Sequence, residues 1–310
     1  MVGRPALEYG SEVCAQFLPR ELEAYQRWTA RRALGAPRNA LGVAAVGDMG
    51  WPALQTRHEQ AMLRFWGRIL DMPHDRLPRC VYEALREENH RNSWSSKVRA
   101  TALAWGLYEV WENQRLPPVE PPSQMSEGDA WKEMLRGLAK RMARAEWRDS
   151  SCHDPQGSIA SNYANWLHVP EGAPSMQMAE YLGEASVEDR GAQILFSLRS
   201  GTSVLRVDAD RMFGIPHSQR LCTFCECGSV EDARHVLMEC PAHEQARRSL
   251  LTKLPSQLCS WDEEGIFNAL MGSEGLARLC PRAAVRFAAL GAIKAFWVAA
   301  LKLRDELLQI

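Results

Sequence analysis

The chain has almost no net charge, because 37 Lys and Arg residues oppose 38 Asp and Glu residues and leave −1 at pH 7. This balance excludes a protein that binds polyanions over its whole surface, and it confines any nucleic-acid contact to a local patch. Nearly all of the basic residues are Arg, whose guanidinium binds phosphate through paired hydrogen bonds. The Arg-rich stretch 20–99 is the candidate patch, although a GC-rich coding sequence would enrich Arg in the same way.

The sequence also lacks the apolar segments typical of a secretory signal and of a membrane-spanning helix. Residues 1–17 contain no basic region followed by an apolar run, so we expect no secretory signal and an intracellular protein, nuclear or cytoplasmic. The most apolar stretch, 283–303, is interrupted by Arg286, Lys294 and Lys302, whereas a membrane-spanning helix needs about 20 nearly uncharged residues. We therefore expect a buried or amphipathic helix there, and no membrane partner. In a reducing compartment the 9 Cys residues are more often metal ligands than disulfides.

Apolar residues recur at helical spacing along most of the chain, which predicts a mostly α fold. A first helix follows Pro19, and a second opens at Pro52 with Arg64 and Arg68 opposite its apolar stripe. Further helices are expected over 80–88, 96–112, 126–148, 179–183, 189–199, 241–254 and 275–308, with irregular chain over 153–172 and 204–220. Clustered prolines within 117–122 indicate a linker. The predicted division is a helical region over 1–115, the linker over 116–125, a helical connector over 126–200, a metal-binding module over 201–250 and C-terminal helices over 251–310.

The segment 222–240 has the ligand spacing of a metal site. Cys222 and Cys225 are separated by two residues and can bind one ion through a tight turn. His235 begins a new element, and Cys240 follows it by slightly more than one helical turn. Three thiolates and one imidazole make a closed tetrahedral site, so the sequence predicts a structural Zn²⁺ without an open position for catalytic water. Because the segment is short and polar, binding of the ion should be coupled to its folding.

Two other residues compete for a place among these ligands. Cys227 could replace Cys222 or Cys225, or remain free, and the Cys222–Cys225 pair is preferred for its two-residue spacer. His243 lies three residues after Cys240, and we interpret it as a solvated helix residue because the tetrahedron is already filled. The alternative without a metal is that the Cys and His residues pack as ordinary reduced side chains.

The residues around this site resemble the C-terminal zinc knuckle of non-LTR (LINE-type) retrotransposon reverse transcriptases. The similarity is carried by residues 220–225, 230–232, 235–237, 240–241 and Arg247, and by the approach over 198–202, Leu205 and Arg211. Residues 9–13 resemble the strand-like entry to the region after the polymerase palm of this family. Residues 34–38, 50–54 and 64–70 resemble its thumb-side helices.

This resemblance implies a thumb-like helical bundle over 1–115 and a reverse-transcriptase-type zinc module over 201–250. It also implies RNA or DNA as a partner, together with the palm of a parent polyprotein. Polymerase chemistry in this family needs an aromatic-x-Asp-Asp motif that holds two metal ions, and the chain contains no Asp-Asp pair. Asp208 and Asp210 are interpreted as part of a solvated loop. We therefore expect a non-catalytic C-terminal region of such an enzyme.

Arg residues are the candidate contacts to nucleic acid, since guanidinium groups bind phosphates without reading the base sequence. They lie on the thumb-like helices and around the knuckle: Arg27, Arg31, Arg32, Arg64, Arg68, Arg220, Arg234 and Arg247. Each of them could instead lie on a solvated helix face. The alternative function is a zinc-stapled helical module that binds another protein, and the salt dependence of binding separates the two.

Overall fold

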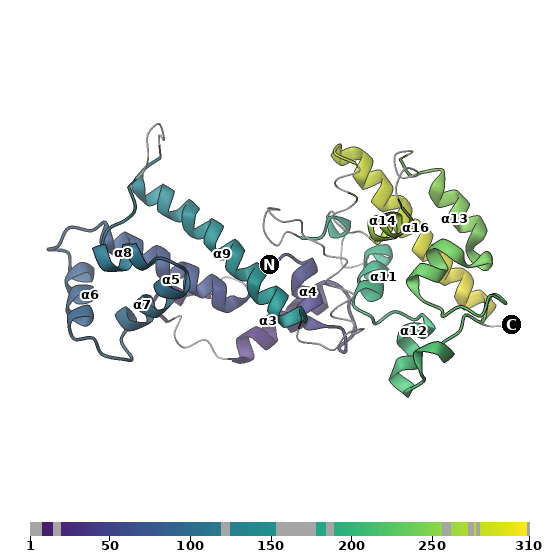
Figure 1. Cartoon of the computed structure of the whole chain (residues 1–310), viewed down its shortest axis with the longest axis horizontal. Coiled ribbons are helices and arrows are strands. Elements are labelled where there is room, and N and C mark those ends of the chain that lie inside the picture. The colour runs from purple at the N-terminus through teal and green to yellow at the C-terminus, as the bar shows by residue number, and fades with distance from the viewer. Residues whose placement is uncertain are drawn as a thin grey trace. The chain divides into compact units, whose positions relative to one another are not determined.

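The computed structural model describes residues 8–14, 20–118, 125–152, 178–183, 189–255, 262–271, 276 and 280–308. Helices make up most of this part of the chain, which confirms the mostly α fold (Figure 1). Within the described ranges there is no strand, and the one β-bridge joins Leu221 and Val230 in antiparallel fashion. The loop expected over 153–172 and most of the predicted linker lie outside the described residues, so the five-part division remains a prediction.

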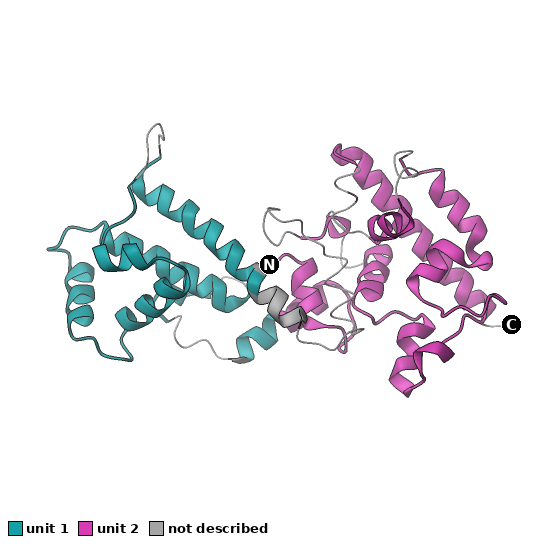
Figure 2. Cartoon of the chain, viewed as in Figure 1, with its two compact units in different colours: residues 1–26, 52–147, 174–176 teal, residues 27–51, 148–173, 177–310 magenta. Residues whose placement is uncertain are grey.

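The chain folds as two compact units, which Figure 2 shows in different colours. Unit 1 comprises residues 1–26, 52–147 and 174–176. Unit 2 comprises residues 27–51, 148–173 and 177–310. Helix α3 (Arg20–Ala33) contributes to both.

Unit 1 is built around α5 (Leu54–Leu70), whose buried face includes Met62, Trp66 and Ile69 as the apolar stripe predicted. The other helices of this unit are α2 (Ser11–Cys14), α6 (Leu77–Glu87), α7 (Trp94–Ala104), α8 (Tyr108–Asn113) and α9 (Glu127–Cys152) as far as residue 147. In the core, Trp66 Nε1 donates a hydrogen bond of 2.9 Å to the Tyr82 hydroxyl. The polar atoms of two large buried rings are thereby satisfied inside an apolar cluster.

Two expectations for unit 1 are wrong. Residues 9–13, expected to be strand-like, contain the start of helix α2. The helix expected over 96–112 is two helices, because Gly106 lies between α7 and α8 with a φ of 75°. That left-handed conformation ends an α-helix, and the Leu107 N–H bonds back to the Ala102 carbonyl at 2.7 Å, as in a Schellman cap.

Helix α9 crosses α5 at a glycine. A Cβ atom placed on Gly67 would lie 2.1 Å from Trp131 Nε1, so only glycine lets the two helices approach this closely. Trp131 Nε1 donates to the Leu63 carbonyl at 3.2 Å, and its ring packs edge-on against Trp66 at 5.9 Å. Trp66 and Trp131 are therefore core residues of unit 1.

The sequence did not predict α4 (Gly42–Asp48) or α14 (Glu263–Leu270) of unit 2, and the irregular chain expected over 204–220 is wrong, because α12 (Arg206–Ala209) and two short 3-10 helices lie there. The others are η2 (Glu180–Leu182), α11 (Arg190–Arg199), η3 (Asp210–Phe213), η4 (His217–Gln219), η5 (His235–Glu239), η6 (Pro241–His243), α13 (Glu244–Leu251) and α16 (Ala283–Leu307). Helices α11 and α13 both pack against α16. Helix α14 begins where the Asp262 carboxylate accepts a hydrogen bond of 2.9 Å from the Gly265 N–H, an ordinary N-cap.

A buried ion pair lies at the centre of unit 2. Arg199 Nη2 and Asp48 Oδ1 are 2.9 Å apart, and both side chains are completely shielded from solvent. Tyr181 donates its hydroxyl hydrogen to Asp48, and Arg199 Nη1 donates to the Met271 carbonyl at 2.9 Å. Because a buried charge is tolerated only when it is fully hydrogen-bonded, these contacts fix α4, η2, α11 and the end of α14 together.

Helix α16 is long and apolar enough to cross a membrane by length and composition alone. The same properties belong to a core helix, and Ile293, Phe296 and Trp297 are buried within unit 2. The expected buried helix is therefore present, whereas the absence of a membrane partner stays a prediction.

Candidate metal centre

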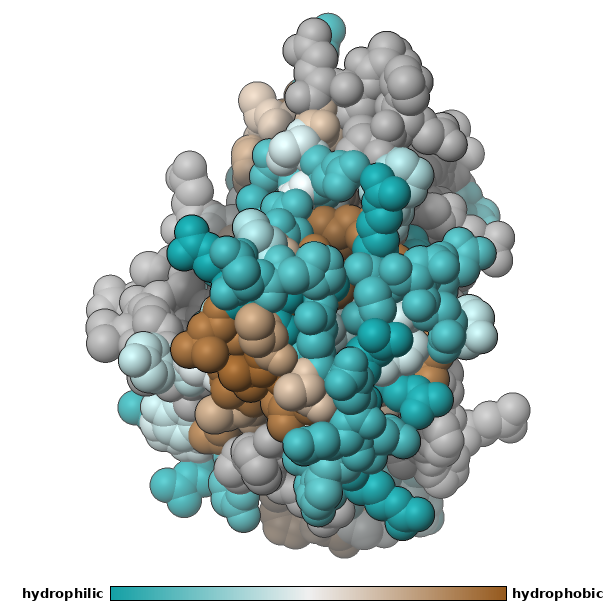
Figure 3. Space-filling view, turned by 90° about the vertical axis from the view of Figure 1, so that its left-hand side faces the viewer, coloured by the Kyte–Doolittle hydropathy of each residue, from teal (hydrophilic) through white to brown (hydrophobic). Residues whose placement is uncertain are grey.

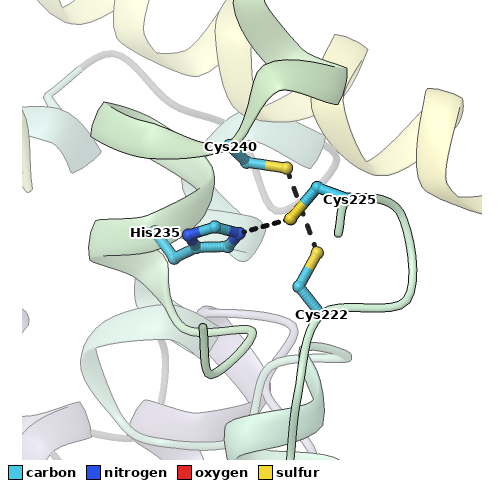
Figure 4. A group of neighbouring side chains, drawn as sticks. All are labelled: Cys222, Cys225, His235 and Cys240. Atoms are coloured by element: carbon cyan, nitrogen blue, oxygen red, sulfur yellow. Dashed lines mark hydrogen bonds between the residues drawn. The ribbon is translucent and has the colours of Figure 1, made fainter. Parts of the chain in front are cut away.

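The four predicted ligands converge on one point (Figure 4). The ligand atoms of Cys222, Cys225, His235 and Cys240 all lie within 4.8 Å of one another. Cys222 Sγ and Cys240 Sγ are 3.9 Å apart, and Cys225 Sγ lies 3.3 Å from His235 Nε2. Cys222, His235 and Cys240 are buried and Cys225 is partly exposed, so the group can hold a metal ion at the edge of the core.

A hairpin-like segment carries the first two Cys residues. The Cys222 N–H donates to the Ser229 carbonyl at 2.8 Å, and the Glu231 N–H donates to the Arg220 carbonyl at 2.9 Å. Gly228 turns the chain between these contacts with a φ of 66°, which glycine adopts without strain. The backbone thus reverses direction, and Cys222 and Cys225 lie on the same tight loop.

A π-helical turn brings the other two ligands together. The Cys240 N–H bonds to the His235 carbonyl at 2.7 Å, which closes a turn of i to i+5 type over His235–Glu239. In an α-helix, residues five apart would point about 140° away from each other. The wider turn therefore matters, because it directs both side chains toward the same point.

Three neighbouring side chains hold this turn in place. Glu239 Oε2 lies 3.2 Å from His235 Nδ1, which leaves Nε2 to face the sulfur atoms. The Asp232 carboxylate accepts a hydrogen bond of 2.7 Å from the His235 N–H. Arg247 donates to the Leu237 and Cys240 carbonyls at 2.9 and 2.8 Å. A carboxylate on the second ring nitrogen of a ligating His fixes its tautomer and orientation, so Glu239 belongs to the site although the sequence did not single it out.

The local environment gives the thiols different acidities. Burial raises the pKa of Cys222 to about 12, and it also raises the pKa of Cys240. Burial would raise the pKa of Cys225 too, but hydrogen bonds from the Cys227 N–H and from His235 outweigh it and lower the pKa to about 7. Cys225 is therefore the thiol closest to its metal-binding thiolate form near neutral pH.

The two competing residues are not among the four converging ligands, although the side chains of Cys227 and Cys225 are hydrogen-bonded to each other. Cys227 is exposed and is not among the four converging side chains. His243 is also outside the group, but it is buried rather than solvated, so that interpretation is wrong. It lies in the turn between Cys240 and α13, where burial lowers its pKa.

The three knuckle arginines are engaged within the protein. Arg220 donates to the Ile215 carbonyl at 2.9 and 2.7 Å and to the Val207 carbonyl at 2.7 Å. Arg234 forms ion pairs with Glu264 and Glu263. Arg247 braces the π turn through two carbonyls. All three therefore have structural contacts that the sequence did not reveal.

The remaining predicted arginines divide between the units. In unit 2, Arg31 Nη1 donates to the Ala40 carbonyl at 3.3 Å, whereas Arg27 and Arg32 are exposed on α3. In unit 1, Arg68 is exposed beside the Phe65 ring, and Arg64 is partly buried with its Nε unpartnered. Within the described residues, Arg27, Arg32, Arg64 and Arg68 make no ion pair with a carboxylate.

Asp208 and Asp210 do not form the expected solvated loop. Asp208 is buried and accepts hydrogen bonds from the Ser203 N–H and hydroxyl at 3.1 and 2.5 Å. Asp210 is paired with Arg206 at 2.7 Å. Among the described residues, the Cys–His group is the one cluster of potential metal ligands.

Comparisons with protein-family models, curated proteins and solved structures find no match to this chain. The resemblance to LINE-type reverse transcriptases therefore stays a prediction from the motifs.

Proposed function

We propose that residues 220–247 form a structural zinc site within a non-catalytic module of the LINE-type reverse-transcriptase C-terminal kind, which binds RNA or DNA. The observation that carries the zinc proposal is the convergence of three sulfur atoms and His235 Nε2. Zn–S bonds of about 2.3 Å would place tetrahedral sulfur atoms roughly 3.8 Å apart, close to the 3.9 Å between Cys222 and Cys240. Thiolate and imidazole donors favour Zn²⁺ over hard cations, and four of them leave no position for a reacting water.

The ion would act as a cross-link inside unit 2. The hairpin-like segment contributes Cys222 and Cys225, and the π turn contributes His235 and Cys240. The segment is short, so the metal bonds would add to the stability that packing supplies. The site is thus a structural support for the surfaces around it.

Nucleic-acid binding is proposed from the resemblance and from the unpaired arginines. In unit 1, Arg64 and Arg68 lie one turn apart on α5, and neither forms a hydrogen bond or ion pair with another described residue. Burial and the nearby Arg136 both lower the pKa of Arg64 and outweigh the opposite effect of Glu133, so a phosphate group there would stabilise the guanidinium. These two arginines are the best-supported contacts of the predicted set.

The test is binding of the zinc-loaded chain to labelled structured RNA and duplex DNA over a range of salt concentrations. The double variant R64Q/R68Q should weaken binding and reduce the slope of log K against log salt by about 2. Its matched control is R91Q/R99Q, which removes two exposed charges from the same unit. Absence of binding to either probe at low salt would refute the nucleic-acid proposal and leave the zinc proposal intact. Primer extension by the purified chain would overturn its non-catalytic character.

A second candidate function is favoured by a hydrophobic face on unit 1. The end of this unit that faces the viewer in Figure 3 shows hydrophobic side chains gathered beside hydrophilic ones. The exposed large apolar residues of helices α6 to α8 are Leu77, Val81, Leu103 and Tyr108. Exposed apolar patches often bind proteins. This function would be supported by a complex with another protein whose affinity does not change with salt concentration.

A further inference from the structure

The turn that follows α12 presents an aromatic ring to solvent. Phe213, the last residue of η3, is 82% exposed, and its neighbour Met212 is 71% exposed. Figure 1 shows α12 and the turn after it at the lower edge of unit 2. Phe213 and Met212 are neighbours, so their side chains offer apolar surface that a partner could cover.

Hydrogen bonds on both sides hold this turn rigid. The Gly214 N–H bonds to the Arg211 carbonyl at 3.0 Å, and the Ile215 N–H bonds to the Asp210 carbonyl at 3.2 Å. Arg220 then clamps the Ile215 carbonyl with two donors. A backbone that is already fixed loses less entropy when a side chain on it binds a partner. Phe213 therefore has the properties of a recognition residue rather than of a frayed loop.

A cavity lined in part by basic side chains lies beside the same turn. Its volume is about 420 Å³, and Arg211, His217, Arg220, Arg234 and Phe267 are among its lining residues. This volume is within the range of small-ligand sites. Phe213 and Arg211 are two residues apart, so their Cα atoms are separated by at most about 7 Å. Phe213 does not line the cavity, but it follows a residue of the cavity wall by two positions.

The charges at this cavity favour an anionic group. Asp208 is buried against Ser203, Asp232 accepts from the His235 N–H, and Glu264 is paired with Arg234. By contrast, Arg211 donates one hydrogen bond, from Nη2 to the Gly201 carbonyl, and its Nη1 lies 3.8 Å from Asp208. Its remaining N–H groups can donate to a ligand. His217 is exposed, and its side chain forms no hydrogen bond or ion pair with another described residue. The available polar groups are thus donors, while the acids are already satisfied.

We propose that this turn binds single-stranded nucleic acid, with one base stacked on Phe213 and an adjacent phosphate held by Arg211 and His217. An exposed aromatic ring next to basic side chains is the combination that binds unpaired strands without sequence preference. A duplex keeps its bases stacked inside and cannot use the ring in this way. The inference rests on the proposed nucleic-acid function and specifies which form of nucleic acid this module takes.

The experiment measures the zinc-loaded full chain against two labelled probes, a short oligothymidylate and a blunt duplex. F213A should weaken oligothymidylate binding roughly 10-fold and leave duplex binding unchanged, because stacking contributes only to the single strand. F213W should retain binding. The matched control is F287A, which removes a ring that is 54% exposed on α16 of the same unit. H217A should weaken oligothymidylate binding without a change in melting temperature.

Photo-cross-linking gives a second readout that does not depend on a variant. An oligonucleotide with 5-bromouracil should cross-link to residues 211–217, as mapped by mass spectrometry. Duplex binding without oligothymidylate binding would overturn this inference and leave the proposed function standing. Equal effects of F213A and F287A, or equal losses on both probes, would also overturn it and would leave Phe213 as an anchor for a protein or a folding residue. If neither probe binds to the wild-type chain, the proposed function fails and the inference fails with it.

Discussion

Arg304 on α16 and Glu231 beside the metal centre form an ion pair, with 2.7 Å between Nε and Oε1. Glu231 is fully buried, and its other oxygen accepts the Arg206 N–H at 3.0 Å. The Arg304 guanidinium also lies over the Phe224 ring, 5.6 Å from its centre, in the loop that carries Cys222 and Cys225. The last helix thus secures the metal loop, which gives residues 283–307 a role that the sequence did not indicate.

Removing the carboxylate should therefore destabilise unit 2. E231Q leaves Arg304 buried without its counter-charge, and we expect a loss of about 3 kcal/mol in the free energy of unfolding. The measurement is urea unfolding of the zinc-loaded protein. K302Q is the control, because Lys302 forms an exposed pair with Glu306 at 3.7 Å on the same helix. The prediction fails if the two variants unfold at the same urea concentration.

Glu239 should affect metal affinity without being a ligand. E239A removes the acceptor on His235 Nδ1, and we expect a decrease in zinc affinity of roughly 10-fold with the stoichiometry unchanged. E239Q keeps an oxygen acceptor, so its zinc affinity should decrease less than that of E239A. Competition with a chromophoric chelator gives both affinities. E226A removes an exposed carboxylate from the same loop and serves as the control. An affinity for E239A equal to that of E226A would contradict the orienting role.

Metal binding should release protons in a pH-dependent manner. The raised pKa values keep Cys222 and Cys240 protonated without metal, while Cys225, with a pKa of about 7, is half ionised at pH 7. Zinc binds thiolates, so it displaces roughly three protons from the thiols at pH 6 and roughly two at pH 8, and any proton on His235 is released in addition. The apparent affinity therefore rises with pH. Calorimetry in buffers of different ionisation enthalpy measures the release, and a proton count that stays constant between these pH values would contradict the assigned acidities.

Gly67 and Gly137 should respond in opposite ways to a methyl group. G67A places a Cβ against Trp131, and we expect destabilisation of unit 1 by about 1–3 kcal/mol. Gly137 lies in α9, where an added Cβ would have no neighbouring atom within 4 Å, so G137A should stabilise the helix by about 0.5–1 kcal/mol. Thermal unfolding of both variants checks this. A stable G67A protein would mean that α5 and α9 do not cross at this glycine.

The ligand set could be predicted because local spacing limits where Cys and His side chains can meet. A two-residue spacer confines Cys222 and Cys225 to one turn, whatever the rest of the fold does. The π turn could not be predicted, since it depends on the Cys240 N–H reaching the His235 carbonyl and on Arg247 holding the Leu237 and Cys240 carbonyls. A carboxylate four residues after a ligating His, as in Glu239, is a signal that could have indicated the orienting contact.

The helices that could be predicted are those whose apolar residues recur regularly on one face. Helix α5 begins two residues after Pro52 and buries the expected stripe. The break at Gly106 was missed because the apolar spacing continues through it, while the backbone conformation does not. Pairs such as Asp48 with Arg199 and Glu231 with Arg304 join distant parts of the chain, and no local pattern reports them.

Zinc content per chain tests the central claim most directly. Protein purified under reducing conditions should contain one zinc ion per chain by elemental mass spectrometry, because one group of four ligands gathers in the described part of the chain. C222S and H235A should lose the ion and unfold the segment around it, with unit 1 intact. C80S and C227S, which change exposed thiols outside the group, should keep it. Full zinc content in both C222S and H235A, or no zinc in the wild-type protein after reconstitution, would contradict the account.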